Sequence, residues 1–160
     1  MRFFNTAGPV NCAKHYCLPP LQRLDLEEIL NLIHQEKYFV LHAPRQTGKT
    51  SCLLALMEYL NREGIYSAVY LNVESAQAAR ENVYDAMHVI IGDLERRTAM
   101  YTGQTLPEKL LSSLWSVNGP FGVLAAALSE MSAQIPRPLV LFTMRSTLLS
   151  GTASSQSYGS

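Results

Sequence analysis

The sequence predicts an α/β protein built around a parallel β-sheet. Three short apolar runs bounded by turn residues have the length of buried strands. Longer segments between them repeat apolar residues at the spacing of a helix. Because alternating strands and helices form parallel βαβ units, this order favours one sheet with helices packed against it. The chain of 160 residues is long enough for one domain with its own core.

Residues 1–24 are expected to form an irregular leader, because prolines and a glycine interrupt them, with a short strand at residues 2–5. Asp25 then has the side chain of a helix N-cap, and two glutamates follow in the first turn. The next apolar residues have the i, i+3, i+4, i+7 spacing of a first helix and are Leu26, Ile29, Leu30 and Ile33.

The middle of the chain alternates between strand and helix patterns. The apolar run at residues 38–41 predicts the first buried strand. A second helix is expected to begin near Lys49 and to stop at Gly64, which is a favourable C-terminal residue. Residues 67–73 predict the second strand.

The second half of the chain predicts three more helices and a third strand. A long helix is expected from about 77 to 97, followed by shorter helices at 107–115 and 120–133, and then by a strand at 139–142. Trp115 and its neighbouring leucines could form a docking face, but their spacing favours packing in the core. These leucines are Leu110, Leu111 and Leu114.

Three segments follow from this pattern: the leader at 1–24, the main domain at 25–142 and a tail at 143–160. The tail contains six serines, three threonines and no acidic residue, so its composition predicts a flexible segment.

Charge and composition exclude several classes of function. The chain carries 13 basic and 13 acidic residues, so its zero net charge gives no reason to expect a nucleic-acid or membrane partner. No apolar run approaches the ~20 residues of a membrane span, and no signal peptide is expected, so the predicted location is the cytoplasm. Cys12, His15 and Cys17 lie close together, but a closed zinc site needs a fourth ligand, so reduced structural thiols are the preferred interpretation.

The residues between the first strand and the second helix fit the phosphate-binding pattern G-x-x-x-x-G-K-[ST], with alanine in place of the first glycine. Gly48 allows the backbone to approach phosphate, Lys49 can reach the β- and γ-phosphates, and the Thr50 hydroxyl can complete a magnesium shell. The alternative is an ordinary basic turn. The predicted nucleotide contacts are Ala43, Pro44, Arg45, Gln46, Thr47, Gly48, Lys49, Thr50 and Ser51.

Over residues 2–142 the chain resembles bacterial AAA-like ATP-binding proteins, which are P-loop ATPases related to the STAND signalling ATPases. The resemblance rests on the stretches Phe4–Pro9, His15–Tyr16, Pro19–Pro20, Tyr38–Thr50 and Tyr70–Glu74. It implies the three-layer P-loop NTPase fold and binding and hydrolysis of ATP with Mg²⁺. By analogy alone, it also implies a homo-oligomer or a protein partner.

The resemblance also implies roles for residues outside the loop. Tyr16 and Pro19 would lie near the adenine, although packing of the leader is the preferred interpretation. Glu74, at the end of the second strand, would position the attacking water, although a solvated or capping carboxylate is the preferred interpretation.

The sequence departs from this family after the third strand. Such ATPases end that strand with Asp-Glu, which holds the magnesium shell and polarises water. Here Thr143 and Met144 follow the strand, and no acidic residue occurs after Glu130. With suitable codons, a one-base shift after Phe142 restores Asp-Glu and a helix-like segment, so we hypothesise a frameshift; a naturally divergent tail is the alternative. The sequence therefore predicts poor hydrolysis, an incomplete sheet with exposed edges and marginal stability.

Two alternative functions also fit the sequence. A small P-loop phosphotransferase would use the same loop but needs a lid rich in arginine, and Arg96–Arg97 is the only adjacent arginine pair. A non-catalytic module that uses nucleotide as a structural ligand or switch would need no acidic motif.

Overall fold

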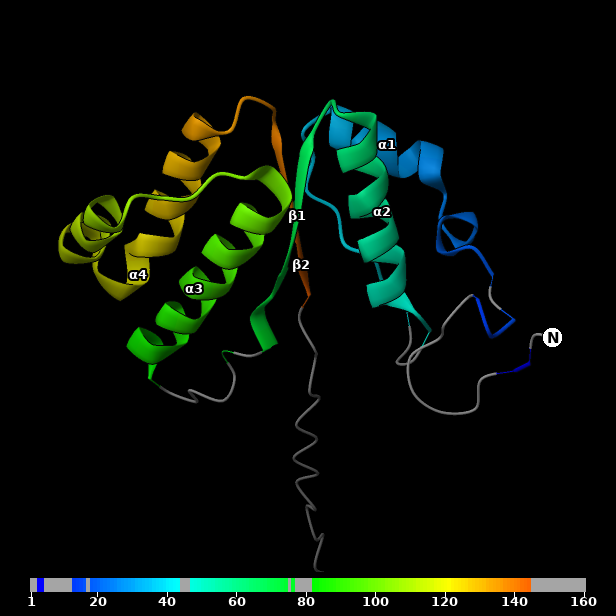
Figure 1. Ribbon diagram of the computed structural model, residues 1–160, viewed down its shortest axis with the longest axis horizontal. Helices are drawn as coiled ribbons and strands as arrows, with labels where there is room; N and C mark the ends of the chain where they lie inside the picture. The colour runs from blue at the N-terminus through cyan, green and yellow to red at the C-terminus, as the bar shows by residue number, and fades with distance from the viewer. Residues whose placement is uncertain are drawn as a thin grey trace, which may run out of the picture.

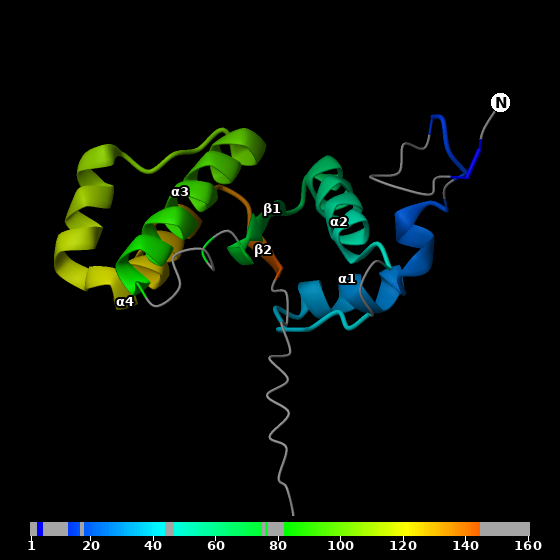
Figure 2. The same ribbon diagram turned by 90° about the horizontal axis from the view of Figure 1, so that it is seen from below.

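The computed structural model describes residues 3–4, 13–16, 18–43, 47–74, 76 and 82–144. Helices α1 and α2 lie on one side of the strand pair, and α3 and α4 lie on the other (Figures 1 and 2). The elements in chain order are η1 (Pro20–Arg23), α1 (Leu26–His34), α2 (Lys49–Glu63), β1 (Ser67–Asn72), α3 (Val83–Thr102), α4 (Glu108–Gln134) and β2 (Leu139–Met144).

The two strands are parallel neighbours, with Ser67 opposite Leu139 and Asn72 opposite Met144. Their parallel direction confirms the prediction of an α/β protein with a parallel sheet. Strand β2 runs two residues past its predicted end at 142, so Thr143 and Met144 belong to the strand rather than to the tail.

Successive residues of β1 point to opposite faces of the sheet and into two separate cores. Leu71 packs with α3 residues that include Ile91, whereas Ala68 and Tyr70 pack with α2 residues that include Leu56. The α3 side of the sheet also receives Leu110, Leu111, Leu114 and Trp115 as half-buried neighbours, as the core interpretation predicted.

The helix ends show the capping chemistry that the sequence indicates. The Asp25 carboxylate accepts a hydrogen bond from the Glu28 backbone N–H at 3.1 Å, so it is the N-cap of α1. Gly64 ends α2 in the left-handed conformation, with φ of 76°. Helix α3 extends five residues past the predicted end at 97, because the next left-handed glycine is Gly103. The residues around its predicted start, 77–81, lie outside the described part of the chain.

Helix α4 contains a break at the place where the sequence predicts a gap between two helices. Gly119 has φ of 61° and ψ of −173°, which is not helical, and Pro120 follows it. Within the described ranges, α4 is also the one helix with the length and apolar composition to cross a membrane. The break divides it into two pieces shorter than a span, and the second piece packs Val123 and Ala127 into the core of this domain.

The predicted strand at residues 38–41 is wrong. These residues are extended coil, with Phe39 and Leu41 half-buried against the α2 core and Tyr38 and Val40 exposed. This in-and-out alternation suits a strand, but a strand also needs a neighbour for its backbone hydrogen bonds, and no described strand lies beside it. Of the predicted strand at 2–5, Phe3 forms one bridge with His15, and residues 2 and 5 lie outside the described part of the chain.

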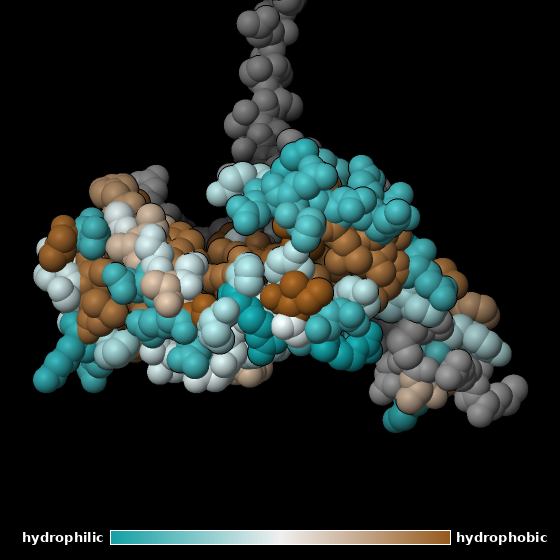
Figure 3. Space-filling model, turned by 90° about the horizontal axis from the view of Figure 1, so that it is seen from above, coloured by the Kyte–Doolittle hydropathy of each residue, from teal (hydrophilic) through white to brown (hydrophobic). Residues whose placement is uncertain are grey.

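The two edges of the sheet differ. On the edge of β1 away from β2, the Asn61 side chain donates to the Ala68 carbonyl and accepts from the Ala68 N–H, both at 2.8 Å. Along the other edge of β2, no strand is paired in the described part of the chain. The space-filling view shows hydrophobic side chains at the hollowed surface between the two helix groups (Figure 3).

We expect Asn61→Leu to destabilise the fold by about 2–5 kcal/mol, because two buried backbone groups of Ala68 lose their partners. Urea unfolding measures the loss. Asn31→Leu, at an exposed position on α1, is the matched control and should change stability by about 0.5 kcal/mol or less. Equal losses for the two variants would show that the Asn61 amide does not protect this edge.

Burial raises the pKa of Glu95 on α3. A raised pKa in the folded state means that Glu95 favours folding below its unfolded pKa, and this contribution is lost as pH rises through the folded pKa. Glu95→Gln should therefore raise the melting temperature at about pH 7 and lose that advantage near pH 3. Glu58→Gln, at an exposed position on α2, is the control. An advantage independent of pH would contradict the prediction.

Candidate functional site

Helix α2 begins at the predicted phosphate-binding loop. Gly48 is its N-cap in the left-handed conformation, with φ of 80°, and the first helical residues are Lys49, Thr50 and Ser51. Backbone N–H groups in this first turn lack partners within the helix and point toward its N-terminal end. Ala43 and Thr47 are described, whereas Pro44, Arg45 and Gln46 lie outside the described residues.

The Lys49 side chain turns back across the loop, and its ammonium group donates a hydrogen bond to the Ala43 carbonyl. This contact holds the two ends of the loop together and keeps the positive charge at the start of the helix. A charge in this place can neutralise an anion that accepts from the backbone N–H groups of α2.

The Thr50 hydroxyl faces the carboxyl end of β2. It donates to the Met144 sulfur at 3.1 Å, across 94 positions of sequence. The fold therefore brings the start of the loop helix to the end of the third predicted strand. The side chain it meets there is an uncharged thioether, a poor ligand for Mg²⁺, which prefers oxygen.

The Met144 sulfur also accepts a hydrogen bond from the Tyr70 hydroxyl at 3.3 Å. Burial raises the pKa of Tyr70, with smaller contributions from the nearby charges of Glu74 and Asp93, while Arg97 acts in the opposite direction. The phenol therefore stays protonated at neutral pH and acts here as a donor.

A second cation, which the sequence did not suggest, lies against the loop. A β-carbon placed on Gly48 would be only 2.9 Å from Nη1 of Arg23, the last residue of η1. Glycine at this position therefore allows both the left-handed backbone and the close approach of the guanidinium. Local sequence patterns do not reveal the contact, because the two residues lie on different elements.

The two other predicted site residues lie apart from the loop in sequence. Glu74 follows β1, and its N–H donates to the Asn72 side chain at 3.0 Å, which confirms its position at the carboxyl end of the strand. Tyr16 is exposed; its ring packs on Phe4, and its N–H donates to the Phe3 carbonyl. The proposed roles of Glu74 in positioning water and of Tyr16 in contacting adenine remain predictions.

The arginine pair of α3 is bound to a buried carboxylate. Asp93 accepts from Arg96 and, at 2.7 Å, from Arg97, whose guanidinium also lies 5.2 Å from the centre of the Tyr70 ring. A hollow of about 360 Å³ lies beside this cluster and reaches Asn72. Both arginines thus pair with a carboxylate of their own helix. This is an ordinary intrahelical ion-pair cluster and not the arginine-rich lid that a phosphotransferase would need.

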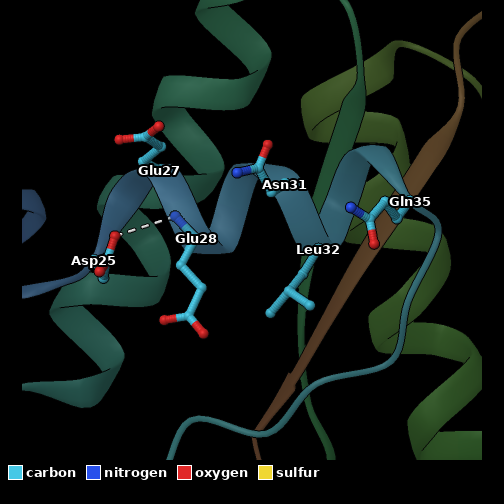
Figure 4. Close-up of a pocket in the computed structure, with 6 residues that line it drawn as sticks. All are labelled: Asp25, Glu27, Glu28, Asn31, Leu32 and Gln35. Carbon is cyan, nitrogen blue, oxygen red and sulfur yellow. Dashed lines mark hydrogen bonds between the residues drawn. The ribbon is translucent and has the colours of Figure 1, made fainter.

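A second hollow, of about 310 Å³, runs along α1 (Figure 4), and its lining residues belong to α1 and its two caps. Its lining includes three carboxylates, which would repel a polyphosphate. The residues are Asp25, Glu27, Glu28, Asn31, Leu32 and Gln35.

The described residues contain no group of three or more side chains suited to hold a metal ion. Cys52 is a buried free thiol whose sulfur donates to the Pro20 carbonyl at 3.4 Å, as a structural cysteine would. The other two cysteines, Cys12 and Cys17, lie outside the described residues. Comparison of the chain with protein-family models, curated proteins and solved structures finds no match.

Gly48→Ala should destabilise the protein by about 1–2 kcal/mol, because alanine resists the left-handed backbone. Gly103→Ala is a matched control, since Gly103 has φ of 72° but nothing within 4 Å of its missing side chain. The Arg23 side chain can swing away, so urea unfolding should give similar losses for both variants. An unchanged stability for Gly48→Ala alone would contradict the left-handed cap of α2.

Proposed function

We propose that this chain is an AAA-like P-loop domain that binds ATP with Mg²⁺ through the loop at residues 43–51. The proposed ligands of the phosphates are the backbone N–H groups at the start of α2 and the Lys49 ammonium, and the proposed metal contact is Thr50. The proposed location is the cytoplasm.

The observation that carries this proposal is the placement of Lys49. Its ammonium group donates to the Ala43 carbonyl, on the far side of the left-handed turn at Gly48, and so lies at the N-terminal end of α2. A polyphosphate bound there would receive backbone hydrogen bonds, the positive end of the helix dipole and a full positive charge together.

The residues at the end of β2 support binding without efficient hydrolysis. Hydrolysis needs a carboxylate that polarises water and another that orders the metal shell, and the strand ends in Thr143 and Met144. The Met144 thioether is the group that contacts Thr50, and it can neither accept a proton from water nor coordinate Mg²⁺ well.

This arrangement also favours one of the alternatives as a refinement of the proposal. A module that binds nucleotide as a structural ligand or switch needs the loop but not the acidic motif. A phosphotransferase is less well supported, because Arg96 and Arg97 are both engaged by Asp93.

We expect the purified chain to bind a fluorescent ATP analogue with magnesium, and Lys49→Ala to weaken that binding about 100-fold, because charged hydrogen bonds to phosphate are lost. Lys109→Ala, at an exposed position on α4, removes the same charge elsewhere and should bind like the wild type. Phosphate release should be equal for the wild type and Lys49→Ala.

Two results would contradict this proposal. Folded, soluble wild-type protein that fails to bind the analogue would rule out the phosphate-loop assignment. Phosphate release by the wild type above the Lys49→Ala level would mean that another carboxylate, with Glu74 the first to test, performs the hydrolytic role assigned to the missing motif.

A further inference from the structure

The position of Arg23 is fixed by the packing of η1 on the first turns of α2. The Pro20 carbonyl, at the start of η1, accepts a hydrogen bond from the Cys52 thiol. On either side of Arg23, Leu21 and Leu24 pack against the α2 core, and the Leu24 N–H donates back to the Leu21 carbonyl. The backbone of Arg23 is therefore anchored, while its guanidinium extends to Gly48.

The charge of Arg23 is placed against other positive charge. The start of α2 carries the positive end of the helix dipole, and Lys49 adds an ammonium group. Among the described residues, both carboxylate ion pairs are made by Asp93, and none is made by Arg23. Arg23 is exposed, so water screens part of this repulsion, and an anion bound between the positive groups would be attracted by all of them.

We propose that Arg23 is a third phosphate-binding group of the nucleotide site and pairs with the phosphate chain from the side of Gly48. This inference rests on the proposed function, because it needs the loop to hold a polyphosphate. It adds a residue outside the loop motif, supplied by the 3-10 turn that precedes α1.

The guanidinium suits this role better than an ammonium group would. Its planar fork can donate two parallel hydrogen bonds to one phosphate, and it is weakly hydrated. The guanidinium also lies close to the loop backbone, since a β-carbon on Gly48 would be 2.9 Å from Nη1.

The test compares binding of ATP, inorganic tripolyphosphate and adenosine by the wild type, Arg23→Gln, Arg23→Lys and Lys49→Ala. The matched control is Arg62→Gln, which removes an exposed arginine from the last turn of α2, about 20 Å along the helix from Lys49. Circular dichroism checks that each variant is folded. Calorimetry at low and moderate salt gives the dissociation constants.

We expect Arg23→Gln to weaken binding of ATP and of tripolyphosphate about 10- to 100-fold and to reduce the salt dependence of binding. Arg23→Lys should recover part of the loss, and Arg62→Gln should bind like the wild type. Adenosine binding should be equally weak for all variants, because adenosine has no phosphate.

The outcomes separate this inference from the proposed function. Wild-type affinity in Arg23→Gln, with loss of binding in Lys49→Ala, overturns the role of Arg23 and leaves the loop assignment intact. A loss for ATP that is absent for tripolyphosphate also overturns it, because the contact would then be with the nucleoside. Binding of neither ATP nor tripolyphosphate by folded wild type overturns both proposals.

Discussion

The parallel pairing of β1 with β2 positions the two cores and the residues at the carboxyl end of the sheet. Each strand sends alternate side chains into the α3–α4 core and the α1–α2 core, so the register fixes both cores at once. It also places Met144 on the same face as Tyr70 and within reach of Thr50. A slip of one residue would turn Met144 to the opposite face and separate the end of β2 from the loop.

The features that sequence predicted well are those determined by neighbours along the chain. The N-cap at Asp25, the left-handed stop at Gly64 and the break before Pro120 follow from local backbone chemistry. The start of α2 near Lys49 also follows from consecutive residues, and the phosphate-binding role of the segment before it stays a prediction. Residues 38–41 have the composition of a strand, but a ladder depends on a partner, which their own sequence does not specify.

Contacts between distant elements could not be predicted in this way. Neither the approach of Arg23 to Gly48 nor the contact of Met144 with Thr50 has a spacing signature, because each joins residues of separate elements. Both alter the chemistry expected of the loop. Arg23 adds positive charge where phosphate would bind, and Met144 brings an uncharged sulfur where a metal shell would form. Under the proposed function, affinity for the nucleotide and its turnover therefore depend on different elements and can be changed independently.

The side chain of Asn61 has a wider consequence for how the sheet can grow. Its amide presents to Ala68 the same donor and acceptor that a backbone in a neighbouring strand would present. One residue of α2 thus takes the place of a neighbouring strand at Ala68. A strand added beside β1 would have to displace this amide, whereas the other edge of β2 is paired with no strand in the described part of the chain, so growth of the sheet beside β2 is favoured.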